Sequence, residues 1–261
     1  MGSVLRRAGD GVDRYGLAAF TGRAAARALR PLLTPLAARR LQRAATAAAP
    51  DLDALVEVAY AFDELGVRIQ PGQVRGEIRG LLRLLEPKSC RRILEIGTQH
   101  GGSLFLLAHV AHPEALLVSV DLPHGEFGGG YPRWRAPLYR RFGRAGQRIE
   151  LIRGDSHSAA TRARVAQLLE GEPLDFLFID GDHTYDGVKR DFELYRDLVR
   201  EGGIVAFHDI TPGREGEREA EESRLQSGDV PRFWAELREQ FPTTELSGSE
   251  LGFYGIGVVY L

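Results

Sequence analysis

Five short apolar runs alternate with segments of helical periodicity between residues 92 and 208. Strands are expected at 92–97, 116–121, 149–152, 174–180 and 203–208. Helices are expected between them, at about 102–111, 137–145, 158–169 and 185–199. Strands that are connected through helices run parallel, and uninterrupted apolar runs indicate a sheet that is covered on both faces.

Two further runs, 243–247 and 253–260, close the chain after a helix predicted at 231–240. They lie too close together for a crossover helix, so we expect an antiparallel hairpin at the sheet edge. The predicted fold is therefore α/β: a Rossmann-like, seven-stranded, mostly parallel sheet with a C-terminal antiparallel hairpin and a helical N-terminal extension. A charged segment at 213–229 shows no strand or helix pattern and is expected to form a lid or a disordered loop.

The basic N-terminal extension, residues 1–68, is expected to precede a main domain at 69–261. The first 50 residues hold nine Arg and two Asp, which leaves a net charge of −9 on the rest of the chain. Residues 17–49 are rich in the helix formers Ala, Leu and Arg, although Pro31 and Pro35 are expected to break them into at least two helices. We expect this arm to pack on the domain or on a second subunit of a homo-oligomer; a membrane-surface helix and a disordered arm are the alternatives.

Composition excludes several kinds of site. Cys90 is the only cysteine, which rules out an intramolecular disulfide and a multi-cysteine zinc site, and it is expected to be buried. No apolar run is long enough to span a membrane, and the first residues lack the apolar core of a signal peptide, so a cytoplasmic location is predicted. The acidic main domain argues against nucleic acid as a partner, because phosphate contacts need a positive surface.

Polar residues and glycines follow the predicted strands at the sheet edge where open α/β sheets bind ligands. The loop after the first strand is Gly-rich but is neither a dinucleotide fingerprint nor a P-loop, because the G-x-G spacing and a Gly-Lys pair are both absent. Asp121 ends the second strand and can accept hydrogen bonds from both ribose hydroxyls; Asp155 follows the third and can accept from an adenine amino group. Either carboxylate could instead cap the turn or helix that follows it.

Acidic residues and histidines follow the fourth and fifth strands, in Asp180-Gly-Asp182-His183 and in His208-Asp209. Adjacent parallel strands bring these segments to one mouth of the sheet. Several carboxylates at one place repel each other unless a cation neutralises them, and a divalent cation with oxygen ligands is the natural solution. A cation bound to an acceptor hydroxyl would lower its pKa, and a nearby base would take its proton.

The chain contains, in this order, Glu95-x-Gly97-x-x-x-Gly101-x-Ser103, Asp121, Gly154-Asp155-Ser156 and Asp180. This series resembles the motifs of class I S-adenosylmethionine (SAM)-dependent methyltransferases, and the resemblance covers roughly residues 70–261. The similarity is closest to the metal-dependent small-molecule O-methyltransferases, which include the catechol type, the enzymes that methylate sugars and macrolides, and the cephalosporin-hydroxylase-like group. The resemblance implies SAM as the cofactor. It implies that the cofactor site comprises Glu95, Gly97, Thr98, Gly101, Ser103, Asp121, Asp155, Ser156 and Asp180.

The resemblance also implies a divalent metal, with Mg²⁺ expected first and Mn²⁺ as an alternative, and it matches Asp180 and Asp209 to ligand positions. His208 stands where the family often has an acidic or amide residue, and as a ligand it would favour Mn²⁺, Fe²⁺ or Zn²⁺. His183 lies three residues past Asp180, where the catechol type carries a lysine base. Asp182 lies two residues past it, where some sugar-methylating relatives place an aspartate.

Both Asp182 and His183 are therefore candidate bases, with His183 preferred because an imidazole titrates near neutral pH. Asp182 could instead cap the next helix, and His183 could be a structural hydrogen-bonding residue. The predicted function is O-methylation of a hydroxyl on a small molecule (a sugar, a polyketide or a glycolipid) in natural-product biosynthesis. The alternatives are a nicotinamide-dependent oxidoreductase, which lacks its fingerprint here, and an inactive binding module, which would leave the clustered carboxylates without a purpose.

Overall fold

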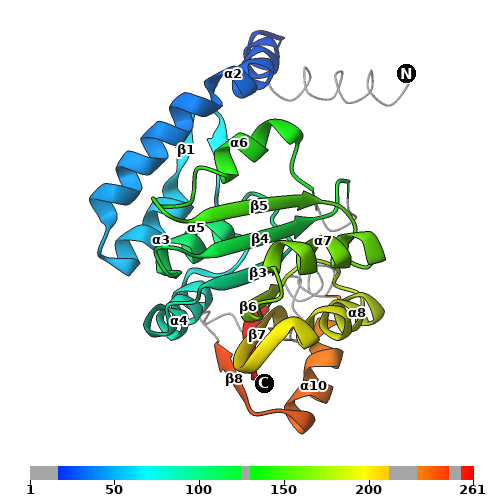
Figure 1. Cartoon of the computed structure of the whole chain (residues 1–261). Helices are drawn as coiled ribbons and strands as arrows, with labels where there is room; N and C mark the ends of the chain where they lie inside the picture. The colour runs from blue at the N-terminus through cyan, green and yellow to red at the C-terminus, as the bar shows by residue number, and fades with distance from the viewer. Residues whose placement is uncertain (1–16, 125–129, 212–227, 247–253) are drawn as a thin grey trace.

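A seven-stranded sheet in the order β5-β4-β3-β6-β7-β9-β8 forms the centre of the molecule in the computed structural model (Figure 1). The structure describes residues 17–124, 130–211, 228–246 and 254–261, with the backbone alone at 17–28. The strands are β3 (Arg92–Ile96), β4 (Leu116–Asp121), β5 (Arg148–Arg153), β6 (Leu174–Ile179), β7 (Val199–Thr211), β8 (Thr243–Leu246) and β9 (Tyr254–Tyr260). Strands β3 to β7 pair in parallel, and β9 is antiparallel to both β7 and β8. The predicted fold class and its terminal hairpin are confirmed.

Two layers of helices cover the sheet because its buried strands are apolar on both faces. Along β6, for example, Phe176 and Phe178 belong to one hydrophobic cluster and Leu177 and Ile179 to the other. The first cluster is covered by α2 (Leu17–Ala48), α3 (Leu52–Ala61), α4 (Arg75–Leu85), α5 (Gly102–Val110) and α6 (Ala136–Tyr139). The second is covered by α7 (Ala159–Leu169), α8 (Tyr185–Tyr195) and α10 (Val230–Gln240). Cys90 is buried in the first cluster, as expected.

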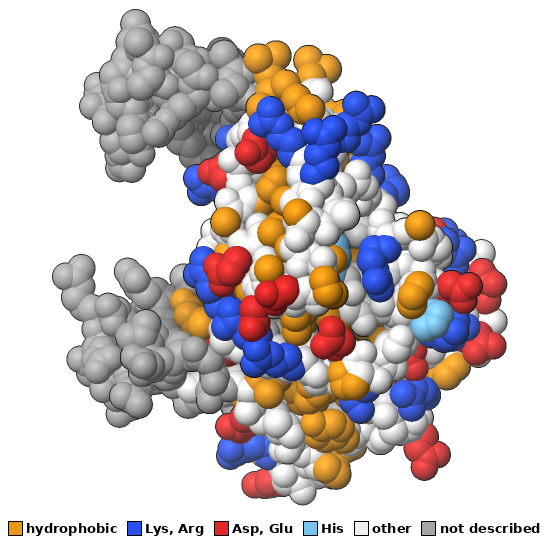
Figure 2. All heavy atoms as spheres, turned by 90° about the vertical axis from the view of Figure 1, so that its left-hand side faces the viewer, with side chains coloured by type: hydrophobic (Ala, Val, Ile, Leu, Met, Phe, Trp, Pro, Cys, Tyr) orange, Lys and Arg blue, Asp and Glu red, His pale blue; other side chains and the backbone are white. Residues whose placement is uncertain are grey.

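Helix α2 runs unbroken through Pro31 and Pro35, so the predicted break was wrong. Both prolines lie on the exposed side of the helix, and the hydroxyl of Thr34 donates a hydrogen bond of 2.7 Å to the carbonyl of Arg30. Packing of the C-terminal half on the body offsets the backbone hydrogen bonds that prolines remove. The buried side of that half consists of Ala37, Ala38, Leu41 and Ala45. Figure 2 views the molecule from the side that carries α2.

Other predicted bounds shift by a few residues. Helix α3 starts after the N-cap Asp51 and ends at Ala61, and a small hairpin of β1 (Asp63–Glu64) and β2 (Val67–Arg68) follows it. The helix expected at 137–145 is replaced by the short α6. Three 3₁₀ turns complete the described elements: η1 (Glu86–Lys88), η2 (Arg133–Arg135) and η3 (Arg196–Leu198). The predicted lid at 213–229 lies outside the described residues except for its last two.

No helix in the part of the chain that the structure describes is long and apolar enough to cross a membrane.

The loop that follows β3 is packed so closely that glycine is required at two positions. Gly97 has a φ of +97°, and a Cβ added there would lie 1.9 Å from the carbonyl oxygen of Asp180, at the end of β6. A Cβ on Gly102 would lie 2.1 Å from the carbonyl oxygen of Ile69. These glycines are therefore explained by the close approach of neighbouring backbone, which fixes the loop against β6 and against the segment before α4.

A buried carboxylate on β3 stabilises the same loop through hydrogen bonds. Glu95, on β3, is fully buried and accepts hydrogen bonds from the hydroxyls of Ser103 (2.6 Å) and Ser119 (3.2 Å). Burial outweighs these two hydrogen bonds and raises the pKa of Glu95 to about 8. Glu95 thus ties β3, β4 and the start of α5 together, and it prefers the protonated form near neutral pH.

This raised pKa predicts a specific pH dependence of stability. Between the ordinary pKa of a glutamate and about 8, the folded state binds more protons than the unfolded state, so the free energy of unfolding falls as pH rises. From pH 6 to 9 the loss from Glu95 alone is roughly 3 kcal/mol. Glu95→Gln should remove this part of the loss, so its melting temperature should fall less over that range than that of the wild type.

The measurement is thermal unfolding at several pH values. The exposed Glu193→Gln on α8 is the matched control and should follow the wild-type curve. If Glu95→Gln and the wild type lose stability in parallel, Glu95 is not protonated in the folded protein.

Candidate functional site

A pocket of about 800 Å³ opens at the carboxyl ends of the parallel strands. One end is lined by the loops after β3, β4 and β5, and the other by the segments after β6 and β7. The lining residues include Gly97, Gln99, Asp121, Gly154, Asp155, Ser156, His157, Asp180, Gly181, Asp182, His183, Thr184, His208, Asp209 and Tyr254. The sheet edge predicted from sequence is therefore the edge that carries the pocket.

Asp121 is the central carboxylate at the β3–β5 end of the pocket. One of its oxygens accepts a hydrogen bond from the backbone N–H of Gln99 (2.9 Å), and the other accepts one from the N–H of Gly130 (2.8 Å). Each carboxylate oxygen has a second lone pair, so Asp121 can still accept from a ligand's hydroxyls. Burial raises its pKa, and the backbone N–H donors oppose that shift.

Asp155 and Ser156 also line the pocket but have local roles. Asp155 is exposed, and its carboxylate accepts from the backbone N–H of His157 (2.8 Å), as in a turn that precedes a helix. The N-cap of α7 is Ser158, so Asp155 is not the cap. The ring of His157 contacts the buried Asp191, since its Nε2 lies 3.3 Å from a carboxylate oxygen of that residue.

Four residues predicted for the cofactor site do not line the pocket. Glu95 and Ser103 bond to each other beneath the loop, and Thr98 is buried and bonds to Ser119. Gly101 adopts a left-handed conformation at the N-cap of α5 and faces the ring of Tyr139. These residues shape the loop, whereas Gly97 and Gln99 form its pocket surface. Gln99 was missed because its backbone N–H, and not its side chain, carries the contact to Asp121.

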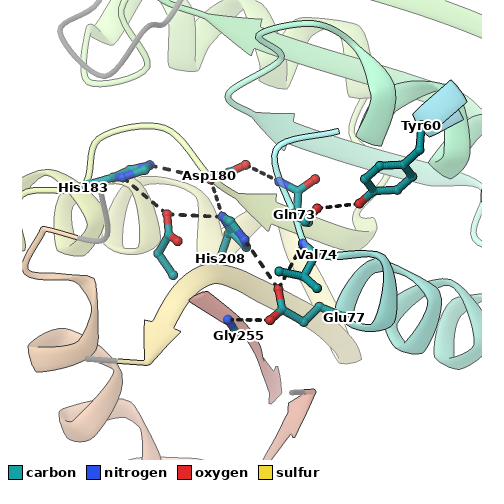
Figure 3. Close-up of polar contacts among 9 residues, drawn as sticks. Tyr60, Gln73, Val74, Glu77, Asp180, His183, His208 and Gly255 are labelled. Carbon is teal, nitrogen blue, oxygen red and sulfur yellow. Dashed lines mark hydrogen bonds and ion pairs between the residues drawn. The ribbon is translucent and has the colours of Figure 1, made fainter. Parts of the chain in front are cut away.

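At the other end, Asp180 and Asp209 face two imidazoles (Figure 3). Nδ1 of His208 lies 3.2 Å from Oδ1 of Asp180 and 3.2 Å from Oδ2 of Asp209. His183 bridges the same pair, with Nε2 3.6 Å from Oδ1 of Asp180 and Nδ1 3.4 Å from Oδ2 of Asp209. Both histidines thus lie between the two carboxylates that the sequence predicted to converge.

An irregularity in β7 brings His208 and Asp209 to the same site. Consecutive residues of a regular strand point to opposite faces. Here the pairing with β9 shifts register between His208 and Thr211, and Asp209 has a φ of +63°. The bulge turns Asp209 toward the pocket beside His208, and aspartate tolerates this conformation better than most residues.

His208 is enclosed on the floor of the site. Besides the two aspartates, its Nε2 lies 3.8 Å from Oε2 of Glu77, and its ring stacks on Tyr254 at a centroid distance of 6.0 Å. Burial lowers the pKa of His208, but Asp209 and Asp180 outweigh it and raise that pKa well above its ordinary value. Burial likewise opposes ionisation of Asp180, but His208 and His183 hold its pKa below its ordinary value.

The residues that could hold a metal are Asp180, His183 and Asp209, whose ligand atoms lie within 4.8 Å of one another. His208, predicted as a ligand, is not a member of this group. Among the described residues, Oδ1 of Asp209 is buried without a hydrogen-bond partner. Two carboxylates, one of them with a free buried oxygen, and an imidazole suit a divalent cation such as Mn²⁺, Fe²⁺ or Zn²⁺.

Asp182 has a local structural role. Its carboxylate accepts from the backbone N–H of Thr184 (2.9 Å), and Thr184 in turn is the N-cap of α8. The alternative prediction that Asp182 caps α8 is therefore wrong, although its carboxylate does hold the turn just before the cap. His183 points toward Asp180 and Asp209, and is better placed than Asp182 to exchange protons at this end of the pocket.

Two residues ahead of β3 support the site and were missed by the sequence analysis. Gln73 donates from Nε2 to Oδ2 of Asp180 (2.6 Å), while its backbone carbonyl accepts the hydroxyl of Tyr60. Glu77 is 1% exposed and accepts from the backbone N–H of Gly255 (3.0 Å). The signal for Glu77 was present, because this carboxylate interrupts the apolar face of the helix that also carries Ile78.

Comparisons with known proteins agree with this geometry. Residues 94–210 match the family described as "Methyltransferase domain". An uncharacterised protein of Sinorhizobium fredii is 26% identical over 183 residues, which cover 69% of this chain and 18% of that protein. An uncharacterised protein of Acanthamoeba polyphaga mimivirus is 33% identical over 116 residues, which cover 44% of this chain and 50% of that protein. The chain thus spans half or less of these curated relatives.

Two solved structures share the fold. The O-methyltransferase TomG of Streptomyces achromogenes, involved in tomaymycin synthesis and solved with SAM, has a TM-score of 0.53 at 20% identity and covers 81% of this chain and 89% of its own. The O-methyltransferase of Bacillus cereus, solved with S-adenosylhomocysteine, has a TM-score of 0.51 at 21% identity. The match covers 84% of this chain and 96% of the Bacillus cereus chain. Residues 94–210 thus resemble a methyltransferase domain, and the likeness to these two structures shows that the chain shares their fold.

Proposed function

We propose that the protein transfers a methyl group from SAM to a hydroxyl of a small molecule, with assistance from a divalent metal. The observation that carries the proposal is that a single pocket joins Asp121 and the loop after β3 to the cluster of Asp180, His183 and Asp209. Methyl transfer from a sulfonium needs a cofactor site and an activated oxygen side by side, and the two ends of this pocket supply residues suited to each.

At the cofactor end, Asp121 would accept the ribose hydroxyls of SAM. The N–H donors of Gln99 and Gly130 hold its two oxygens in place, so the carboxylate is oriented before a ligand binds. Gly97 gives this end a wall with no side chain, and Asp155 and Ser156 line the side where an adenine would lie.

At the acceptor end, Asp180 and Asp209 would hold the metal through carboxylate oxygens. When bound, the cation would supply Lewis acidity that lowers the pKa of an acceptor hydroxyl. His183 would take the proton, and its ring would be oriented by Asp209 on the Nδ1 side and by Asp180 on the Nε2 side. His208 and Gln73 contact Asp180 and would fix the rotamer of its carboxylate.

The acceptor is proposed to be a hydroxylated small molecule such as a sugar, a polyketide or a glycolipid. The acceptor end of the pocket is lined by carboxylates and imidazoles, which suit a polar acceptor. That TomG is an O-methyltransferase involved in tomaymycin synthesis is consistent with a role in natural-product biosynthesis. The alternatives are a catalytically inactive binding module and a nicotinamide-dependent oxidoreductase. The first experiment distinguishes both from a SAM-dependent methyltransferase.

That experiment is thermal unfolding with S-adenosylhomocysteine or NAD⁺. A ligand at 100 times its dissociation constant adds about 2.7 kcal/mol to the free energy of unfolding, so binding is readily seen as a rise in melting temperature. We expect a rise with S-adenosylhomocysteine that is lost in Asp121→Ala and kept in the exposed control Asp186→Asn. No rise would favour the binding module, and a rise with NAD⁺ instead would favour the oxidoreductase.

Metal binding can be measured separately, by titration calorimetry with Mn²⁺. Asp209→Asn and Asp180→Asn should each weaken binding by about tenfold or more, because each removes a charged ligand. Asp182→Asn is the matched control and should bind Mn²⁺ like the wild type. Equal binding by all four proteins would place the cation elsewhere or show that the site holds none.

The base is tested by methyl transfer to any acceptor found in a panel of sugars and phenols. His183→Asn should lower kcat by about 10²-fold or more, since positioned proton transfer contributes 10²–10⁴-fold. Asp182→Asn should change kcat less than about tenfold. Calorimetry on the same variants separates the base from a ligand, because loss of Mn²⁺ binding in His183→Asn would make His183 a ligand. A larger loss of kcat in Asp182→Asn would reverse the two roles.

A further inference from the structure

Helix α2 has two sides of different character. Toward the body it buries small and apolar side chains, among them Ala38 and Leu41, against α3 and its neighbours. Its opposite side faces solvent from residue 29 onward. In Figure 1 the helix lies along the outside of the molecule, and its N-terminal half extends beyond the body.

The solvent side begins with an apolar patch. Leu29, Leu32 and Leu36 are 49%, 76% and 44% exposed, and their spacing of three and four residues puts them on one face of the helix. Across the described residues the structure has four large exposed hydrophobic side chains, and three of them are in this patch. Leucines gathered in this way on a surface helix indicate an interaction surface.

A cluster of guanidinium groups continues the same face. Arg39, Arg40 and Arg43 follow Leu36 at helical spacing and are exposed. Arg40 forms an ion pair with Glu64, whereas Arg39 and Arg43 have no ion pair within the described part of the chain. Figure 2 shows this order, with hydrophobic side chains at the top of the molecule and a band of basic side chains directly below them.

Charge argues against a second copy of α2 as the occupant of this face. Helix α2 contains six Arg and neither Asp nor Glu, so a second α2 would bring only further cations to Arg39 and Arg43. A stable protein–protein interface also needs about 800 Å² and 20–30 residues from each partner, far more than three leucines and the neighbouring turns provide.

An anionic lipid surface fits both properties. Leucine side chains can enter the acyl boundary while guanidinium groups on the same face remain with the lipid phosphates. Each basic residue near such a surface adds to binding through its attraction to the lipid phosphates. Outside α2 the chain carries a net charge of −8, so repulsion of the body would leave α2 as the side that approaches the membrane.

We propose that the face formed by Leu29, Leu32, Leu36, Arg39 and Arg43 docks the protein on the surface of a membrane that contains anionic lipids. The helix lies along that surface and does not cross the membrane. The arm was expected to pack on the domain or on a second subunit; the C-terminal half of α2 does pack on the domain, and its exposed face would contact lipid. This docking does not depend on the proposed reaction.

The test is co-sedimentation of the full-length protein with vesicles. We expect binding to phosphatidylcholine vesicles that contain about 30% phosphatidylglycerol, little binding to phosphatidylcholine alone, and release in about 0.5 M salt because screening weakens the phosphate contacts. Leu32→Glu, and the double variant Arg39→Glu with Arg43→Glu, should each lower the partition coefficient at least about tenfold. Leu32→Phe should keep it.

Arg164→Glu, on the exposed side of α7, is the matched charge control and should bind vesicles within about twofold of the wild type. Circular dichroism checks that every variant is folded. Binding that is equal for both vesicle types, or that falls equally in Arg164→Glu, overturns the proposal. A second result also overturns it: the wild type forms a dimer in sedimentation experiments and does not bind vesicles, and Leu32→Glu dissociates that dimer. Such a result would assign the face to a second copy of the chain.

Discussion

The mutual repulsion of two carboxylates at one sheet edge is the constraint on which the site depends. Asp180 and Asp209 each lie 3.2 Å from the same nitrogen of His208, and His183 approaches both. Bringing two carboxylates out of water to one point is costly unless cations or hydrogen-bond donors accompany them. The two imidazoles, and the amide of Gln73, supply that compensation and hold the cluster in place.

The backbone beneath this cluster is also closely packed, at the ends of β3 and β6. The ends of β3 and β6 touch where Gly97 meets the carbonyl of Asp180, and the N–H of Asp180 donates to the carbonyl of Ile96 (2.8 Å). The loop that forms the cofactor end is thereby fixed to the first residue of the acceptor end. In the proposed reaction this contact would set the distance between the methyl group of SAM and the acceptor oxygen, which an in-line displacement requires to be short.

Sequence patterns predicted the sheet and the strand ends because both follow from local periodicity. Asp121, Asp180 and Asp209 reach the pocket as expected, since residues after parallel strands share one edge. The same reasoning could not separate residues that line the pocket from those beneath it. Glu95 stands in the motif, but the alternation of side chains along β3 points it into the core. The bulge at Asp209 and the continuity of α2 depend on tertiary contacts, and no local pattern reveals them.

Some residues of the site lie inside the segment that matches the methyltransferase domain, 94–210, and others lie outside it. Inside are the loop after β3 and the cluster of Asp180, His183 and Asp209. Outside are Gln73, which bonds to Asp180, Glu77, which lies beside His208, and Tyr254, which stacks on His208. Glu77 also accepts from the backbone of Gly255 and so joins α4 to β9.

In the proposed reaction the reacting groups would lie in the segment that matches the methyltransferase domain. Part of their support, from Gln73, Glu77 and Tyr254, comes from the flanking elements. Relatives that share only the central segment can keep the same chemistry while these flanking elements differ. Acceptor selectivity is then expected to depend in part on the flanking elements, because Gly72 and Tyr254 line the pocket and Gln73 contacts Asp180.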